Sequence, residues 1–377
     1  MGAGLLAVRD FVACLRHGPD GPAGPLDHAF AFGVSQSGRF LREFLYHGLN
    51  VDEAGRPVFD AVIPHVAGAR RGEFNQRYGQ PSVQHAPSLG HLPPFTDAEL
   101  LRRQRELGGV PRVFTINTSS EYWRSEASLL HIVDGADVAP PAEVRTYLFA
   151  GCQHGPGVLP PARIPAMSPW VRPANRLNTV DYTPLLRAAL VNLERWVVDG
   201  VEPPPDAVPR LSDGTAADRE GVLGLFAAAD VDADLPRPEG LPALRHLDLG
   251  DRVGEGVVRL PAVAGEPYPC LVSALDADLN EAAGIRLPDL TVPVAVQTGW
   301  NPRRPESGGA GQTVDMLGSS IPLAGASVPE RYGDRDRYCS LVRAEAERLV
   351  EARHLLAEDV ERVVARAAAA YDAYAAD

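Results

Sequence analysis

A serine in a turn of small residues is the first candidate for chemistry in this 377-residue sequence. Ser35 stands within Gly33–Gly38, which reads Gly-Val-Ser-Gln-Ser-Gly. An apolar run at 29–32 precedes the turn, and residues 39–45 follow it with helical spacing. A strand, a tight turn with serine at its apex and a helix are typical of a nucleophile elbow. In such a turn the first backbone N–H groups of the helix, here starting with that of Gln36, face developing negative charge and form an oxyanion hole.

The turn departs from the usual G-x-S-x-G pattern at its fifth position. Ser37 stands there, and the glycine follows one residue later at Gly38. Serine is small enough for close packing of a helix on a strand, so the departure weakens the pattern without removing it. The alternative is an ordinary strand–turn–helix connection without a catalytic role.

A serine nucleophile needs a base that takes its proton and an acid that orients the base. In doubly wound hydrolases these groups follow later strands, in the chain order Ser, acid, His. Glu121 is the first carboxylate after a predicted strand at 110–117, and His154 lies in a loop between two glycines after a predicted strand at 144–150. Ser35, Glu121 and His154 are therefore candidates for nucleophile, orienting acid and base.

Each of these residues also has a plainer interpretation. Glu121 follows Ser119 and Ser120, and its carboxylate could accept from unpaired N–H groups at the start of a helix. His154 could be a simple turn residue. Cys152 is close enough to His154 to form a Cys/His pair, but both lie in one loop without an elbow.

Four further residues are candidates for substrate binding. His65 ends a predicted strand at 59–66 and could line the cleft, although a packed, hydrogen-bonded histidine is the simpler reading. Arg70, Arg71 and Trp123 would adjoin the same cleft. The arginines could bind a carboxylate or carbonyl of a substrate, and surface ion pairing is the alternative. No histidine pair has ligand spacing on a helix, so we expect neither a metal nor a cofactor.

The elements that must position these residues follow from hydrophobic spacing. Apolar residues three and four apart predict helices at 3–16, 37–48 and 185–198. Short β-prone runs predict strands at 29–33, 59–66, 110–117 and 144–150. Strands separated by helices or long crossovers favour a parallel sheet and an α/β fold.

The chain divides by composition into three predicted regions. Residues 1–205 form the α/β core, with a long loop at 69–111 that we expect to act as a lid or pocket wall. Residues 206–330 are rich in Pro and Gly, with β-prone pieces at 256–260, 268–274 and 291–298. Residues 331–377 are predicted C-terminal helices, because 336–374 have helical periodicity and few helix breakers.

Charge and composition exclude several classes of partner. The net charge is −13 without a basic cluster, which argues against nucleic acid. No apolar run approaches the ~20 residues that span a bilayer, and the N-terminus has no basic segment like that of a signal peptide. Four widely spaced cysteines are expected to be reduced thiols. We therefore expect a cytoplasmic protein that acts on a small molecule, without nucleic-acid or membrane partners.

Four N-terminal motifs together resemble a bacterial family of α/β-hydrolase-domain proteins with a Gly-x-Ser-Gln-Ser-Gly elbow. The motifs lie at 32–42, 59–71, 117–123 and 151–155, and the similarity continues at 283–288 and 298–301. The resemblance covers nearly the whole chain. It implies a Ser35–Glu121–His154 triad and hydrolysis of an ester, lactone or thioester. It does not imply a particular substrate.

The chain differs from the α/β-hydrolase pattern before the elbow. That fold places four strands ahead of the elbow strand, whereas only one helix precedes it here. The missing loop normally supplies a second oxyanion N–H, whose loss costs ~2.7–4 kcal/mol of transition-state stabilisation. Without those strands the elbow strand would be an open edge of the sheet, and proteins usually cover the unpaired N–H and C=O groups of such an edge. The chain could begin late in a longer protein, a partner or second copy could supply strands, or residues 206–300 could cross the edge. The alternative function is a hydrolase-derived scaffold, cyclase or lyase without hydrolytic activity.

Overall fold

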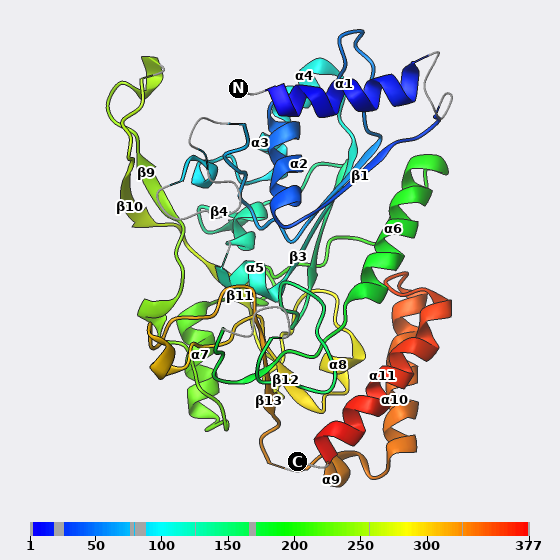
Figure 1. The fold of residues 1–377 in the computed structure, drawn as a ribbon. Helices are drawn as coiled ribbons and strands as arrows, with labels where there is room; N and C mark the ends of the chain where they lie inside the picture. Colours follow the sequence, from blue (N-terminus) through cyan, green and yellow to red (C-terminus); the bar gives the residue numbers. More distant parts are fainter. Residues whose placement is uncertain are drawn as a thin grey trace.

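A four-stranded parallel sheet forms the centre of the protein (Figure 1). The computed structural model describes residues 3–18, 26–75, 79, 88–124, 126–165, 171–255, 257–325 and 327–375. The sheet has the order β1 (Phe30–Val34), β2 (Ala61–His65), β3 (Arg112–Thr118) and β6 (Val144–Phe149). The four predicted strands are confirmed, and each observed end lies within two residues of the predicted one. The fold is therefore of the α/β class, with a mixed C-terminal extension.

Helices cover both faces of this sheet. On one face, α1 (Ala3–His17) and α2 (Gln36–Tyr46) share an apolar cluster with β2 that includes Leu5, Phe44 and Val62. On the other face, α6 (Thr183–Val198) places Trp196 beside Phe114 of β3. The predicted helices at 3–16, 37–48 and 185–198 correspond to these three elements.

The remaining elements surround this core. Close to the sheet lie α3 (Asp97–Leu100), α4 (Arg102–Leu107), α5 (Ser119–Arg124), β4 (Ile132–Val133) and β5 (Ala136–Asp137). The later strands are β7 (Arg176–Leu177), β8 (Ala216–Asp218), β9 (Arg245–Asp248), β10 (Val263–Pro267), β11 (Leu271–Ser273), β12 (Ala295–Gln297) and β13 (Ser319–Pro322). The later helices are α7 (Arg219–Ala228), α8 (Pro288–Thr291), α9 (Val328–Tyr332), α10 (Arg335–Glu351) and α11 (Val360–Ala375).

Two residues of the segment 206–300 pair with the β6 edge of the sheet, which is the edge opposite β1. Ala207 pairs in parallel with Tyr147, and Ile285 pairs in parallel with Phe149. Of the three alternatives for the β1 edge, cover by residues 206–300 gains no support from these pairs, which lie at the opposite edge. On β1, Phe32 and Val34 remain 56% and 44% exposed.

Not every β-prone piece is a strand. The predicted piece at 256–260, whose first residue lies outside the described residues, has no strand structure at 257–260, whereas 268–274 and 291–298 contain β11 and β12. Residues 257–260 lie between β9 and β10, which pair with each other as an antiparallel hairpin. The helical region 336–374 is split into α10 and α11, which pack against each other. The division of the chain after residues 205 and 330 stays a prediction. Among the described residues, no helix is both long and apolar enough to cross a membrane.

Candidate active site

Ser35 lies at the sharp turn between β1 and α2. Its backbone has φ 55° and ψ −113°, a strained conformation for a residue with a side chain. The Ser35 N–H donates to the carbonyl of His65 at 2.8 Å, which fixes the turn against the end of β2. The Ser35 side chain makes no capping hydrogen bond with α2. These are the backbone features that the elbow motif predicts.

The two glycines of the turn are required by close backbone contacts. A Cβ atom on Gly33 would lie 2.4 Å from the carbonyl oxygen of Ser37. A Cβ atom on Gly38 would lie 2.9 Å from the carbonyl oxygen of His65. Ser37 itself is exposed. The close approach of helix to strand therefore occurs at Gly38, which is why the fifth position of the motif tolerates serine.

Glu121 and His154 are in direct contact. His154 Nδ1 lies 2.6 Å from Glu121 Oε1, and Thr118 donates to Glu121 Oε2 from its backbone N–H at 3.0 Å and its hydroxyl at 2.5 Å. Burial raises the pKa of Glu121, but the charge and hydrogen bond of His154, together with Arg124 and Thr118, lower it to about 2. An ionised carboxylate accepts from Nδ1–H, so His154 Nε2 is left to act as a base.

The loop that carries His154 is held by distant parts of the chain. The His154 N–H donates to the carbonyl of Met316 at 3.3 Å, and the Gly318 N–H donates to the side chain of Gln153 at 3.1 Å. The hydroxyl of Tyr182 donates to the carbonyl of His154 at 2.7 Å. The base is thus positioned by segments that follow β6 by many residues.

His65 connects the serine turn to the Glu121–His154 pair. Its carbonyl accepts from Ser35, and its Nε2 lies 3.3 Å from the Tyr182 hydroxyl that also contacts His154. Burial lowers the pKa of His65 to about 4, so this imidazole is neutral near pH 7. The side chain is only 1% exposed. The structure therefore places His65 as a packed residue beneath the site.

The other three candidates for substrate binding are scattered. Trp123 is buried in the core against Trp300. Arg71 pairs with Glu43 at 3.0 Å and lies over the Tyr46 ring, near the far end of α2. Arg70 alone approaches the site, where its Nη2 donates to the carbonyl of Arg124 at 3.2 Å.

Three residues around the site had no distinct signal in the sequence. Thr118 contacts Glu121, and Tyr182 contacts His154. Arg39 lies one turn after Ser35, with its N–H donating to the Ser35 carbonyl at 3.0 Å. Arg39 follows Ser35 by four residues, which places both on one face of the helix. Only this spacing could have indicated that Arg39 lies near the site.

The Cys/His alternative has little support from the geometry. The Cys152 thiol is buried, donates to the carbonyl of Ala150 at 3.2 Å, and has a pKa raised well above its ordinary value by burial. A thiolate nucleophile needs the opposite environment. Within the ranges that the structure describes, no group of three or more His, Cys, Asp or Glu side chains could hold a metal ion.

The contacts of Glu121 predict a pH-dependent contribution to stability. A carboxyl with a folded-state pKa near 2 contributes stability above its ordinary pKa of 4.5 and loses it as the pH falls towards 2. We expect the free energy of unfolding of the wild type to fall more steeply than that of Glu121→Gln below pH 4.5, by about 1–3 kcal/mol in total. Urea unfolding of both proteins at a series of pH values measures this difference. A difference that stays constant down to pH 3 would contradict the assignment.

A family model described as "Alpha/beta hydrolase domain" matches residues 6–365, nearly the whole chain. No curated protein and no solved structure matches the chain.

Proposed function

Because the chain belongs to the alpha/beta hydrolase domain family, we propose that it is a serine hydrolase that cleaves a carboxylic ester, lactone or thioester. In this proposal Ser35 is the nucleophile, His154 the base and Glu121 the residue that orients the base. The observation that carries the proposal is the Glu121–His154 contact at 2.6 Å. This pair is linked through Tyr182 and His65 to the strained strand–turn–helix connection that carries Ser35.

The acylation step follows from these roles. Nε2 of His154 removes the Ser35 hydroxyl proton while Oγ forms a bond to the acyl carbon, and the carbonyl electrons move to the oxygen. When the intermediate collapses, the bond to the alcohol or thiol breaks and His154 returns its proton to that leaving group. Glu121 holds the Nδ1–H tautomer and stabilises the imidazolium. Water then attacks the acyl carbon while His154 takes its proton. When the second intermediate collapses, the bond to Oγ breaks, His154 returns the proton to Oγ, and the acid and free Ser35 are released.

The oxyanion of each intermediate needs hydrogen-bond donors. The first N–H of α2, that of Gln36, follows the nucleophile directly and is the proposed donor. The positive end of the α2 dipole acts on the same oxygen.

Covalent labelling tests the proposal directly. We expect a neutral alkyl fluorophosphonate to label the folded protein once per chain, with the adduct mapped to Ser35 by peptide mass spectrometry. Phosphonylation needs the activated serine and its base but no knowledge of the natural substrate. A folded protein that is not labelled, or is labelled at another residue, would overturn the proposal and favour the non-hydrolytic alternative.

A further inference from the structure

Glu281 is a buried carboxylate that links the two segments carrying Glu121 and His154. It lies in the chain between β11 and α8 and is only 4% exposed. Its Oε1 accepts from the Ser119 hydroxyl at 2.6 Å, and its Oε2 accepts from the Gly151 N–H at 2.7 Å. Ser119 precedes Glu121 by two residues, and Gly151 precedes His154 by three. One side chain is therefore hydrogen-bonded to both sides of the Glu121–His154 contact.

The two linked segments leave the sheet side by side. They follow β3 and β6, which are neighbouring parallel strands. The Ser120 N–H donates to the carbonyl of Cys152 at 3.2 Å, so the segments also touch through their backbones. Gly151 has φ 64°, the left-handed conformation that favours glycine. The backbone at Gly151 sets the direction of the loop, and Glu281 holds this backbone.

Other groups near Glu281 leave its charge largely uncompensated. Arg286 acts on it as a cation, but Arg286 is itself paired with Asp276. Tyr122 of α5 and Cys152 of the loop also interact with Glu281, and burial raises the pKa of both well above their ordinary values, so both stay neutral near pH 7. The side chains of α7, β11 and β12 that line the small cavity beside Glu281 carry no charge.

The environment of Glu281 makes its ionisation sensitive to pH near neutrality. Burial raises the pKa of Glu281 to about 7, although Ser119, Gly151 and Arg286 act in the opposite direction. A proton on the carboxyl group replaces one acceptor by a donor. The Ser119 hydroxyl can rotate to accept from it, whereas the Gly151 N–H can only donate. A hydrogen bond from this N–H to a neutral carboxyl group is about half as strong as one to a carboxylate.

We propose that Glu281 is a positioning residue of the triad, and that its ionised form holds the His154 loop against the Glu121 segment more firmly than its neutral form. This inference rests on the proposed function and adds a regulation of the same site by pH. Glu281 acts through Gly151 on the position of His154, not on the substrate. Because small displacements of a catalytic group cost much of a rate, protonation of Glu281 should slow the reaction of Ser35 in the folded protein.

The first test compares the wild type with Glu281→Gln by the rate at which the neutral alkyl fluorophosphonate labels Ser35. Glutamine resembles the neutral carboxyl group, because its amide donates to Ser119 while its carbonyl accepts from Gly151. We expect similar rates at about pH 6 and a wild type about 5- to 10-fold faster at about pH 8, the difference between a charged and a neutral hydrogen bond. A merely structural role would give a ratio that does not change with pH.

A second variant tests the same link without changing Glu281. The Ser119 hydroxyl lowers the pKa of Glu281, so Ser119→Ala should raise it. The rise of the labelling rate with pH should then move to higher pH, by about one unit for the loss of one hydrogen bond. In Glu281→Gln/Ser119→Ala this shift relative to Glu281→Gln should vanish, because the titrating carboxyl group is gone.

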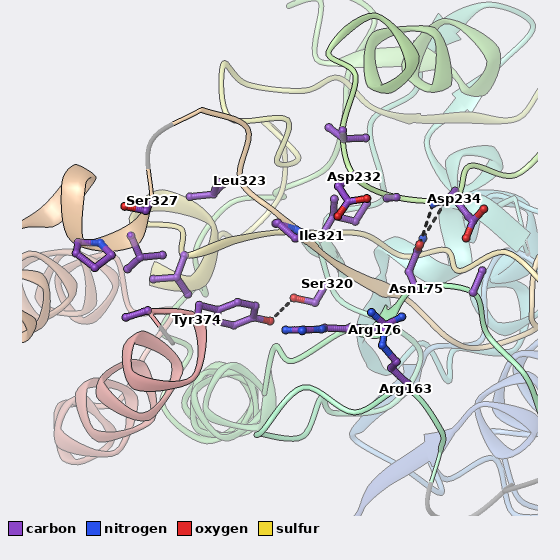
Figure 2. Close-up of a pocket in the computed structure, with 18 residues that line it drawn as sticks. Arg163, Asn175, Arg176, Asp232, Asp234, Ser320, Ile321, Leu323, Ser327 and Tyr374 are labelled. Atoms are coloured by element: carbon purple, nitrogen blue, oxygen red, sulfur yellow. Dashed lines mark hydrogen bonds between the residues drawn. The ribbon is translucent and has the colours of Figure 1, made fainter. Parts of the chain in front are cut away.

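Two other carboxylates provide controls for the loss of one negative charge. Asp206 accepts from the Thr146 N–H at 2.8 Å, within β6 and ahead of the loop. Asp232 lies at the wall of a cavity of about 740 Å³ whose lining includes none of the three triad candidates (Figure 2). Asp206→Asn and Asp232→Asn should each keep a constant ratio to the wild type across the same pH range. Urea unfolding at both ends of this range verifies that every variant is folded.

The outcomes separate this inference from the proposed function. A ratio of wild type to Glu281→Gln that is constant with pH would overturn the inference and leave the proposed function intact. An unchanged pH profile in Ser119→Ala would do the same, and it decides alone if Glu281→Gln does not fold. A folded wild type that is not labelled at any pH would instead overturn the proposed function.

Discussion

Replacing Ser35 by alanine is expected to lower kcat for ester hydrolysis by about 10³- to 10⁶-fold, because no nucleophile would remain to form the acyl-enzyme. The fold should be retained, since the Ser35 side chain makes no capping hydrogen bond with α2 and alanine keeps the same backbone. We expect the free energy of unfolding to change by less than about 0.5 kcal/mol. Steady-state kinetics on an activated ester and urea unfolding measure the two quantities.

The same turn supplies a matched control. Ser37 is exposed two residues further along, so Ser37→Ala should keep nearly the full activity. His154→Ala should lose about as much activity as Ser35→Ala, and the double variant hardly more, because the two residues act as one unit. A Ser35→Ala protein that keeps a tenth of the activity, or additive losses in the double variant, would contradict the assigned roles.

Replacing Arg42 by methionine is expected to lower the free energy of unfolding by about 3–5 kcal/mol. Arg42 is 0% exposed, and its guanidinium donates to Asp97 at 2.6 Å and to the carbonyl of Phe95 at 2.6 Å. Asp97 also accepts from the Thr115 hydroxyl at 2.8 Å. Without Arg42 the Asp97 carboxylate would be buried without its cation. Urea unfolding at pH 7 measures the loss.

Two further variants separate the contribution of the ion pair to the free energy of unfolding from the effect of losing a large side chain. Arg42→Met/Asp97→Leu should recover part of the lost stability, because it removes the stranded charge together with its partner. Arg102→Met is the control on the same side of the protein. Arg102 is 73% exposed and lies 3.6 Å from Glu106, so its loss should cost less than about 1 kcal/mol. A cost below 1 kcal/mol for Arg42→Met would show that the pair contributes little.

The strands and the order of the triad candidates could be predicted because both are local properties of the sequence. Each parallel strand is an apolar run, and each candidate residue directly follows one of these runs. The elbow was recognisable although Ser37 departs from the motif. The position that has no room for a side chain is the next one, and it is occupied by Gly38. These signals depend on neighbouring residues, which a single sequence shows.

The charged residues of α2 show why the rest could not be predicted. Helical spacing in 39–45 predicts a helix but does not say that Arg39, Arg42 and Glu43 are buried. Arg42 and Glu43 contact Ala69, Arg71 and Asp97, which lie 27 to 55 residues away in the chain. Such pairings are set by tertiary structure, so the hydrophobic pattern of a single sequence does not show them.

The distant supports of the His154 loop have a consequence for the protein during its synthesis. Gly151 and Gln153 are held by Glu281 and Gly318, which lie 130 and 165 residues further along the chain. A growing chain therefore carries the serine turn well before the residues that fix its base have been made. We expect a chain stalled soon after α6 to react slowly with fluorophosphonates, and reactivity to arise only when the last third has emerged from the ribosome.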